Sequence, residues 1–529
     1  MNKKPIHVLI PMSGQGTRYQ KAGYTDPKPL IAVNGIPMIE RLLEKFPLSW
    51  ACTFVLAENH KDSGLVELLK KLRPTSQILF VTVHQQGPAF PLEQSLSYLP
   101  EDAGLLVSYC DYGLCWDPWH FQDFVSYTDC EACLISYRGF HAHYLSPVPY
   151  AYSRLTGELV TEVREKGSFT ADREAEFASC GAYYFKNKKV LAKALSFQKQ
   201  QDLKVNGEYY TSLTVEALLQ SQQQAQVRIY EIPYFFQWGT PEDLKDFEYW
   251  ETVFKNKNRH EQNSLKTEQI LLPMAGLGSR FKALTSTRKP FIKISGVPMY
   301  EKALGCLPKA DRVGIVSLED LKPQVNEDYH FLGLKDTPAG QALTVYEGLK
   351  LLDLKKPVIV SACDHGLVIN PDLWTQFLSE KWDAAVFAIK GFPGTRRSPQ
   401  SYSFVETTQA SENKNFPDVK KIHLKKAISN TPQKDFLLVG TFWFKSAQIL
   451  LDGIEELKKE NTLVNNELYL DGIFDQLAKK QLKSVVFPLD GYFNWGDPDS
   501  LKESLYWEEV FSGHTLSSRG RFPGVDFKN

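Results

Sequence analysis

Two glycine-rich stretches, each followed by an arginine and then by a lysine beside a proline, could perform phosphate chemistry. The first holds Gly14, Gln15, Gly16, Thr17 and Arg18, and the second holds Gly276, Leu277, Gly278, Ser279 and Arg280. Lys28-Pro29 follows ten residues after Arg18, and Lys289-Pro290 nine residues after Arg280. Glycines between a strand and a helix let backbone N–H groups approach phosphate oxygens, and arginine and lysine supply the opposing charge. The pattern therefore predicts a phosphate-binding loop in each half of the chain.

The spacing distinguishes these loops from two more familiar ones. A dinucleotide-binding turn needs a third glycine, and Tyr19 and Phe281 occupy that position. The chain has no Walker A sequence. A glycine pair alone is also typical of an ordinary strand-to-helix turn, so the prediction depends on the lysine that follows each loop and can hold a second phosphate.

An aspartate follows a strand-like run in each half of the chain, Asp111 in SYCDYG and Asp364 in SACDHG. A lone aspartate at such a place is commonly a helix cap or a turn former. A carboxylate also suits Mg²⁺, which can bridge phosphates and offset charge in an in-line displacement. Because each aspartate accompanies a glycine loop, we predict that Asp111 and Asp364 bind Mg²⁺ or Mn²⁺.

The elements expected around these residues form a mainly parallel sheet. In the first half, strands are predicted at 6–12, 52–58, 76–83 and 104–114, and helices at 38–46, 60–72 and 92–98. Such alternation predicts an α/β, doubly wound, Rossmann-like fold. Ligands bind outside the carboxyl ends of the strands in such sheets, so Gly14, Gln86 and Asp111 are expected to converge. Residues 131–240 have longer loops and are predicted to form a mixed, acceptor-binding half.

The second half repeats these landmarks. Gly14 to Gly276 is 276 − 14 = 262 residues, Asp111 to Asp364 is 364 − 111 = 253, and Gly239 to Gly496 is 496 − 239 = 257. Similar offsets at independent landmarks indicate two copies of one domain. We expect domain 1 at 1–254, a polar linker at 255–268, domain 2 at 269–511 and a C-terminal tail at 512–529.

Composition argues against several other classes of protein. The formal net charge is −1, so no global field favours nucleic acid or an anionic membrane. Cys130 and Cys133 lack a second CxxC or a nearby histidine pair, and they indicate the start of a strand rather than a zinc or redox site. The chain shows no signal-peptide pattern and no apolar run of about 20 residues. We expect a cytoplasmic protein without a membrane span.

The GxG[TS]R loop, the Lys-Pro pair and the strand ending in Cys-Asp resemble the sugar nucleotidyltransferases, also called nucleotide-diphospho-sugar pyrophosphorylases. The resemblance covers both repeats nearly end to end and is strongest to the branch found with capsular and surface-polysaccharide genes. It implies that the glycine loop and arginine bind a nucleoside triphosphate and that the lysine contacts its phosphates. It also implies that Gln86-Gly87, and less clearly Ala339-Gly340, contact the base.

The acceptor side of the family is also resembled. The implied acceptor-binding residues are Glu165, Lys166, Gly181, Asn206 and Glu208 in the first repeat, and Lys426, Gly440, Asn465 and Glu467 in the second. The second repeat differs here, since Lys425-Lys426 aligns with Glu165-Lys166. Many family members carry a second metal-binding aspartate where Gln237 and Asn494 stand in this chain. The second metal ligand is therefore in question.

The expected activity is transfer of a nucleoside monophosphate from a nucleoside triphosphate to a small phosphorylated acceptor. The expected catalytic residues are Arg18, Lys28, Asp111, Arg280, Lys289 and Asp364. The sequence does not identify the nucleotide or the acceptor. The two domains could pack on each other. One alternative is that domain 2 is a non-catalytic nucleotide-binding module that regulates domain 1 or docks a partner. A wholly non-catalytic binding protein is disfavoured, because it need not keep arginine, lysine and aspartate in both repeats.

Overall fold

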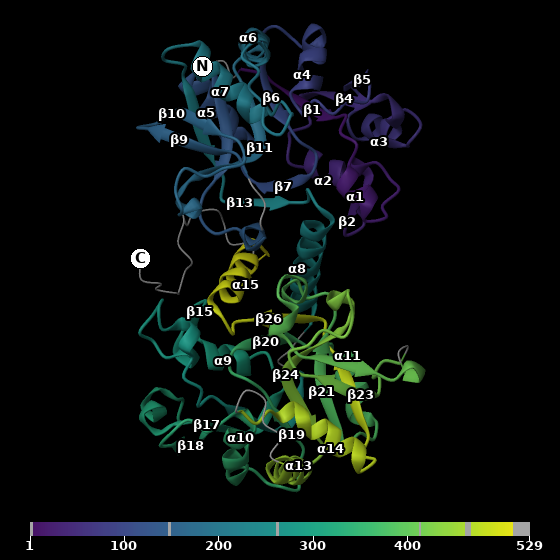
Figure 1. Ribbon diagram of the computed structural model, residues 1–529, viewed down its shortest axis with the longest axis vertical. Helices are drawn as coiled ribbons and strands as arrows, with labels where there is room; N and C mark the ends of the chain where they lie inside the picture. The colour runs from purple at the N-terminus through teal and green to yellow at the C-terminus, as the bar shows by residue number, and fades with distance from the viewer. Residues whose placement is uncertain (1–3, 147–149, 261–263, 412–413, 461–466, 512–529) are drawn as a thin grey trace. The chain divides into compact units, whose positions relative to one another are not determined.

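A computed structural model describes residues 4–146, 150–260, 264–411, 414–460 and 467–511. These residues form two compact units, and the division falls between Glu248 and Tyr249 (Figure 1). The division lies inside helix α8 (Pro241–Arg259). The first residues of the expected 255–268 linker are therefore helical, and strand β14 begins at Lys266.

The helix continues into the expected linker because its charged residues have partners within unit 2. Lys257 Nζ lies 3.1 Å from Glu508 Oε1. His260, one residue past the helix, has its Nε2 2.7 Å from Asp490 Oδ2. Side chains that suggested a solvated linker are therefore partly buried within unit 2. The expected tail at 512–529 lies outside the described residues.

Unit 1 is built on a mixed, mainly parallel sheet with the order β10-β9-β11-β6-β1-β4-β5, and β8 and β12 join it beside β11. Its strands are β1 (Ile6–Met12), β4 (Ala51–Ala57), β5 (Gln77–Val81), β6 (Gly104–Ser108), β8 (Ala132–Tyr137), β9 (Tyr152–Thr156), β10 (Leu159–Arg164), β11 (Phe177–Phe185) and β12 (Val227–Glu231). The order β5-β4-β1-β6 is parallel, and β11 runs antiparallel to β6. The sheet changes direction of connection between β1 and β6, which is where ligands bind in such folds.

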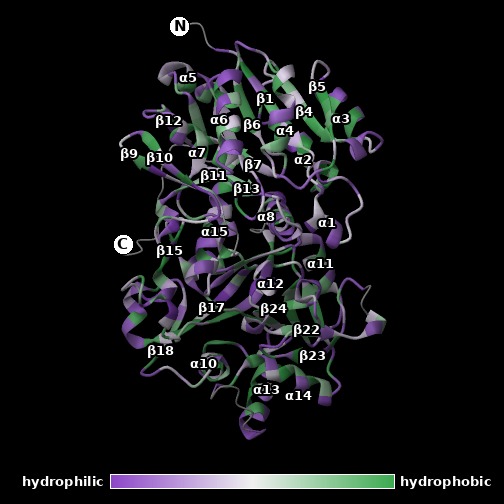
Figure 2. Cartoon of the chain, turned by 45° about the horizontal axis from the view of Figure 1, so that its top comes forward, coloured by the Kyte–Doolittle hydropathy of each residue, from purple (hydrophilic) through white to green (hydrophobic). Residues whose placement is uncertain are grey.

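Successive residues of β1 point to opposite faces of the sheet, so both faces carry apolar side chains, and helices cover both. Val8 packs with residues of α2 (Met38–Leu43), α3 (Leu65–Leu72) and α5 (Pro118–Thr128). Leu9 packs with residues of α4 (Phe90–Ser95), α6 (Lys188–Gln200) and α7 (Thr211–Ser221). The strands carry much of the hydrophobic colour in Figure 2, and the loops are largely hydrophilic. The predicted α/β, doubly wound class is confirmed.

Unit 2 repeats the arrangement, with the sheet order β18-β17-β14-β19-β24-β21-β25 and β22 and β23 beside β24. Its strands are β14 (Lys266–Pro273), β17 (Lys309–Leu318), β18 (His330–Leu334), β19 (Val358–Val360), β21 (Ala384–Ile389), β22 (Phe404–Thr407), β23 (Val419–His423), β24 (Phe436–Phe444) and β25 (Ser484–Pro488). Its helices include α9 (Met299–Leu304), α10 (Gln341–Gly348), α11 (Pro371–Ser379), α13 (Ala447–Glu460), α14 (Ile473–Lys479) and α15 (Pro498–Phe511). The parallel and antiparallel pairings follow the same order as in unit 1.

One expectation about unit 1 needs correction. The strand expected at 104–114 is interrupted, because β6 ends at Ser108 and β7 (Tyr112–Cys115) leaves the main sheet to pair with β13 (Tyr234–Gln237). Asp111 lies in that interruption. Residues 131–240, predicted to be a mixed half built onto the nucleotide half, share its sheet, since β11 pairs directly with β6. Among the described helices, none is both long and apolar enough to cross a membrane.

Replacing Phe54 by alanine should destabilise unit 1. Phe54 lies in β4 with 0% of its surface exposed, so the change leaves a cavity and should lower the free energy of unfolding by about 3–5 kcal/mol. Tyr127 in α5 is 82% exposed and provides the control. Tyr127→Ala should change the free energy of unfolding by less than about 0.5 kcal/mol. Denaturant unfolding of both variants measures this. Equal losses would contradict the described core.

Candidate functional site

The glycine loop and the lysine that follows it form one structural feature. Gly16 has a left-handed backbone with φ 62° and precedes α1 (Thr17–Lys21). A Cβ on Gly16 would lie 3.3 Å from Lys28 Cβ, and a Cβ on Gly278 would lie only 2.7 Å from Lys289 Cβ. Glycine at this place is therefore needed both for the positive φ and for the close passage of the lysine. The sequence pattern of a glycine loop followed by Lys-Pro has this physical reason.

Each lysine reaches across to the aspartate at the end of the neighbouring strand. Lys28 Nζ lies 2.5 Å from Asp111 Oδ2 and donates to the Gly239 carbonyl oxygen at 3.3 Å. In unit 2, Lys289 Nζ lies 2.5 Å from Asp364 Oδ2 and 3.2 Å from the Gly496 carbonyl oxygen. The lysine and aspartate predicted to act together therefore meet in both units.

The pair in unit 2 stays ionised at neutral pH. Burial opposes the charged form of Lys289, but the nearby Asp364 carboxylate outweighs it and raises the pKa of the lysine. Burial likewise opposes ionisation of Asp364, and Lys289 together with His365 lowers the pKa of that carboxyl below its usual value. Opposite charges at short range account for both shifts.

A cavity of about 530 Å³ opens above the pair in unit 1. The predicted site residues that line it are Gly14, Gln15, Gly16, Thr17, Lys28, Gly87, Asp111, Asn206 and Glu208. The other lining residues are Pro11, Met12, Ser13, Pro29, His84, Gln85, Pro88, Pro91, Tyr109 and Cys110. A cleft of this size suits a nucleotide-sized ligand. Residues from the ends of β1, β5 and β6 thus meet at one place, as the parallel sheet predicts.

Two predicted nucleotide-side residues of unit 1, Arg18 and Gln86, are not among the residues that line the cavity. Arg18 is exposed, and its charge acts on Tyr210 at the rim. Gln86 is exposed, and its backbone carbonyl accepts a hydrogen bond from the Tyr209 N–H at 2.8 Å. Its neighbour Gln85 supplies the lining instead. Arg280 is exposed in unit 2 and acts in the same way on Tyr469.

Gly87 allows the base-side loop to touch the acceptor-side loop. Its φ is +90°, and a Cβ there would lie 2.7 Å from both the N and the O of Tyr209. The Ala89 N–H donates to the Tyr209 carbonyl at 3.0 Å, which closes the contact. Gly340 repeats this in unit 2, with φ +107° and a Cβ position 2.5 Å from the N and O of Leu468. Gly87, which the resemblance implies is a contact of the base, therefore also allows two loops to pack together.

Ser13 and His84 are site residues that the sequence did not single out. Ser13 Oγ lies 2.9 Å from His84 Nε2, which ties the glycine loop to the segment after β5. In unit 2 the same two segments are joined differently, since Thr337 Oγ1 donates to the Ala275 carbonyl at 2.8 Å. An isolated serine and histidine 71 residues apart carry no spacing signal, so only the fold brings them together.

The acceptor side of unit 1 contains a chain of three polar groups. Lys166, with φ +59°, donates from Nζ to the Tyr210 hydroxyl at 2.5 Å. That hydroxyl donates in turn to Glu208 Oε2. Glu208 and Asn206 line the cavity, so Tyr210 links the acceptor-side lysine to the cavity wall. Glu165 accepts from Ser212 Oγ at 2.5 Å, and burial raises the pKa of its carboxyl.

Unit 2 keeps this chain of groups with Lys425 rather than Lys426. Lys425 has φ +45°, its Nζ lies 3.3 Å from the Tyr469 hydroxyl, and Tyr469 donates to Glu467 Oε2 at 2.5 Å. Lys425 is thus the counterpart of Lys166, one residue before the predicted Lys426. Both repeats have glutamate, any residue, then tyrosine, and this shared spacing was the available signal. Asn465 lies outside the described residues.

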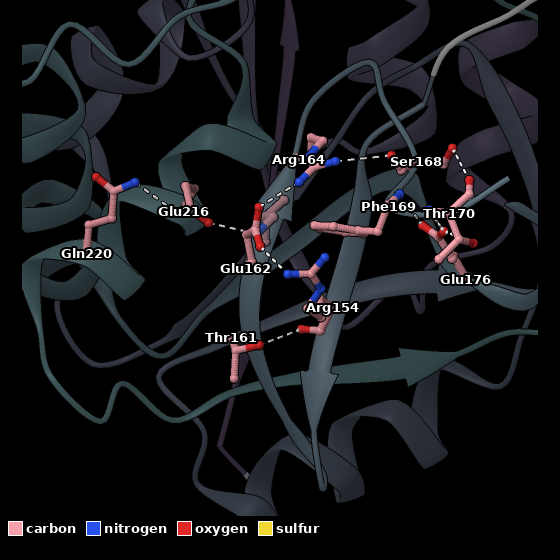
Figure 3. Close-up of polar contacts among 11 residues, drawn as sticks. Arg154, Thr161, Glu162, Arg164, Ser168, Phe169, Thr170, Glu176, Glu216 and Gln220 are labelled. Atoms are coloured by element: carbon pink, nitrogen blue, oxygen red, sulfur yellow. Dashed lines mark hydrogen bonds and ion pairs between the residues drawn. The ribbon is translucent and has the colours of Figure 1, made fainter.

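Polar contacts fix the end of β10, immediately before Glu165 (Figure 3). Glu162 accepts from Arg154 at 2.9 Å and from Arg164 at 3.1 Å. Both guanidinium groups lie over the Phe169 ring, at 4.4 and 4.3 Å from its centroid. The Phe169 N–H donates to Glu176 at 2.8 Å. This network holds the loop that follows Lys166 against the hairpin.

The two predicted glycines of the central antiparallel strand also have positive φ. Gly181 has φ +87° at an irregularity in the register of β11, and a Cβ there would lie 3.0 Å from the Tyr109 ring. Gly440 has φ +79° at the equivalent place in β24, with His365 as its nearest neighbour. Both glycines are required by backbone conformation, and in unit 1 the strand bends beside the cavity.

His365, Cys130 and Cys133 are buried. His365 is 3% exposed, and its Nε2 lies 2.8 Å from Thr441 Oγ1. Burial lowers its pKa to about 4. Cys130 and Cys133 are buried as free thiols, and Cys133 lies in β8, so the predicted strand is present there.

The described residues contain no cluster of three or more histidine, cysteine, aspartate or glutamate side chains that could hold a metal. Gln237 donates from Nε2 to Asp243 Oδ2 at 2.7 Å, and Asn494 Oδ1 accepts from the Gly496 N–H at 2.9 Å. Each unit thus offers one carboxylate, Asp111 or Asp364, at the predicted place. One carboxylate fits Mg²⁺ that takes its other ligands from substrate phosphates and water.

No protein-family model matches the chain. A stretch of 97 residues is 34% identical to a mannose-1-phosphate guanyltransferase of Kluyveromyces lactis and covers 18% of this chain and 27% of that relative. The chain is similar there to a sugar-phosphate nucleotidyltransferase. The matched stretch spans only about a quarter of that relative's length.

Two solved structures are similar to about half of the chain. One is a nucleoside-diphosphate-sugar pyrophosphorylase of Vibrio cholerae RC9, with 19% identity over 46% of this chain and 99% of that chain, at a TM-score of 0.37. The other is an inositol-1-phosphate CTP transferase of T. maritima, with 15% identity over 46% of this chain and 97% of that chain, at a TM-score of 0.36.

Replacing Gly87 by alanine should force the base-side loop away from Tyr209. The Cβ would overlap backbone atoms, and backbone cannot turn aside as a flexible side chain can. Gly139→Ala is the matched control, since Gly139 has φ +81° but nothing within 4 Å of its Cβ position. We expect Gly87→Ala to lower the free energy of unfolding by about 1–3 kcal/mol more than the control. If thermal denaturation shows equal losses of the free energy of unfolding in both variants, the expected overlap of the new Cβ with Tyr209 is wrong.

Proposed function

We propose that each unit transfers a nucleoside monophosphate from a nucleoside triphosphate to a phosphorylated sugar or a similar small phosphate ester and releases pyrophosphate. The products would serve as precursors of a surface polysaccharide. The observation that supports the proposal most directly is the lysine–aspartate pair under a glycine loop, present in both units. In unit 1 a cavity of about 530 Å³ stands above it.

The reaction needs no side-chain nucleophile, because the acceptor phosphate is already an anion. One of its oxygens attacks the α-phosphorus of the triphosphate, a P–O bond forms, and the bond from the α-phosphorus to the oxygen that bridges to the β-phosphate breaks. Pyrophosphate leaves with that oxygen and its electron pair. Positioning and electrostatic stabilisation then provide the rate enhancement.

Residues of this chain have distinct tasks in that scheme. Lys28 and Arg18 offset the charge that develops on the phosphates, and Lys289 and Arg280 do so in unit 2. Lys166, which donates to the Tyr210 hydroxyl, holds the acceptor phosphate. Asp111 would hold Mg²⁺, which would supply positive charge to offset that of the phosphates.

The free lysine–aspartate pair explains how these charges remain ready for a ligand. Lys28 and Asp111 have side chains that are 20% and 27% exposed, so both are partly desolvated. Each offsets the charge of the other, since leaving one partly buried charge without its partner is costly. A bound triphosphate gives the lysine a new anionic partner and leaves the aspartate free for a cation.

A second candidate function for unit 2 is nucleotide binding without catalysis. Leu277 replaces Gln15 on its glycine loop and is 50% exposed. Thr337 and Ala275 form the loop contact made by His84 and Ser13 in unit 1. These changes favour a different nucleotide or a regulatory role, and separate inactivation of the units distinguishes the two.

Asp111→Asn should slow pyrophosphate release with the acceptor of unit 1 by about 10²–10³-fold, because it removes one electrostatic stabiliser. Asp364→Asn should do the same with the acceptor of unit 2. Turnover is measured on the full chain with Mg²⁺ or with EDTA, across nucleoside triphosphates and phosphorylated sugars and alditols. Asp102→Asn, an exposed change at the opposite end of β6, should leave both rates intact.

Near-normal turnover in Asp111→Asn would contradict the role given to unit 1. Two acceptors lost separately with the two aspartates would make the chain bifunctional. A single acceptor, lost only in Asp111→Asn, would leave unit 2 as a nucleotide-binding module.

A further inference from the structure

A carboxylate stands close to the acceptor-side lysine in each unit, but it comes from opposite walls of the site. In unit 1 it is Glu165, directly after β10, and Ser212 of α7 donates to it at 2.5 Å. The corresponding positions in unit 2 are Leu424 and Asp471. Leu424 corresponds to Glu165, because each directly precedes the matched lysine. Asp471 corresponds to Ser212, because each lies two residues after the matched tyrosine, Tyr469 or Tyr210.

Asp471 lies in the same corner as Lys425. It is 8% exposed, in the 3₁₀ turn η14 (Leu470–Gly472) that precedes α14. Burial raises its pKa to about 6, while a hydrogen bond from Ser403 and the charge of Lys425 act in the opposite direction. Asp471 is thus a buried carboxylate in the corner where the Lys425 N–H donates to Ser403 Oγ at 3.3 Å.

The hydroxyl donor has moved together with the carboxylate. Ser403 occupies the place of Ala151, since the Ser179 N–H donates to the Ala151 carbonyl in unit 1 and the Leu438 N–H donates to the Ser403 carbonyl in unit 2. Three changes therefore go together: glutamate to leucine, serine to aspartate and alanine to serine. They keep one carboxylate and one hydroxyl donor in the corner while exchanging the wall from which each comes.

Random drift would more readily leave this corner with no carboxylate, or with two that repel each other. The lysine, tyrosine and glutamate contacts of the acceptor side recur in both units. The groups proposed to hold the acceptor phosphate are thus kept, while the surroundings of the acceptor body differ. That is the place where one phosphorylated acceptor is distinguished from another.

We propose that the corner carboxylate determines which phosphorylated acceptor each unit takes, Glu165 from the strand side in unit 1 and Asp471 from the helix side in unit 2. A carboxylate accepts hydrogen bonds from acceptor hydroxyls, and the lysine fixes the phosphate. The two units therefore recognise hydroxyls on opposite sides of the phosphate. Leu424 gives unit 2 an apolar wall where Glu165 stands in unit 1, so its acceptor lacks a hydroxyl on that side.

The inference rests on the proposed function and is tested by moving the unit 2 corner into unit 1. The variant combines Glu165→Leu, Ser212→Asp and Ala151→Ser, in an Asp364→Asn background that silences unit 2. Pyrophosphate release gives kcat and KM over sugar phosphates and alditol phosphates, and KM for the nucleoside triphosphate is measured alongside. Glu44→Leu, an exposed change at the end of α2, is the control for the added leucine.

We expect KM for the acceptor of unit 1 to rise by about ten- to a hundredfold, as expected for loss of a hydrogen bond to a charged group. Preference should shift toward the acceptor of unit 2, with KM for the triphosphate unchanged. The reciprocal pair Leu424→Glu and Asp471→Ser, in an Asp111→Asn background, should shift preference the other way. That second construction keeps the test valid if the first variant does not fold.

Unchanged acceptor preference in both exchanged corners would overturn the inference and leave the proposed function standing. Equal losses toward every acceptor and toward the triphosphate would also overturn it, since they would show a purely structural role. If the wild-type chain releases no pyrophosphate from any pair of substrates, the proposed function fails and this inference fails with it.

Discussion

The site depends on one short ion pair between the segment after the glycine loop and the end of the neighbouring strand. Lys28 and Asp111 form it in unit 1, and Lys289 and Asp364 form it in unit 2. The glycine loop must be free of a side chain where the lysine passes, and the strand must break where the aspartate turns toward it. A partly buried charge is tolerated because its partner is 2.5 Å away. The same requirement explains why glycine, lysine and aspartate recur together.

The two units conserve contacts more closely than residues. At the start of α8 the Asp243 carboxylate accepts from Thr240 Oγ1 at 2.6 Å. At the start of α15 the partners are exchanged, since Ser500 Oγ donates to Asp497 Oδ2 at 2.7 Å. The exchanged carboxylate at the acceptor corner follows the same pattern. A second copy can therefore diverge in its ligand while the geometry that holds phosphate stays constrained.

Much of the fold could be predicted because its signals are local. Alternating hydrophobic strands and amphipathic helices indicated a parallel sheet, and that topology brought Gly14 and Asp111 together. Other features depend on contacts that no local pattern encodes. Lys425 takes the place of Lys166 through a positive φ at a strand end, and a comparison of sequence letters selects its neighbour instead. The polar stretch after Phe254 continues as helix because its charges find partners more than 200 residues away.

We propose that the nucleoside monophosphate, which contains the α-phosphate, is transferred from the triphosphate to a phosphorylated acceptor. Incubation of the chain with a triphosphate labelled at the α-phosphorus, in the presence of Mg²⁺ and an acceptor phosphate, tests this directly. The account predicts that the label appears in a nucleoside diphosphate ester of the acceptor, with one unlabelled pyrophosphate released for each label transferred. Label released as free nucleoside monophosphate, or a γ-phosphate on the acceptor, would contradict it.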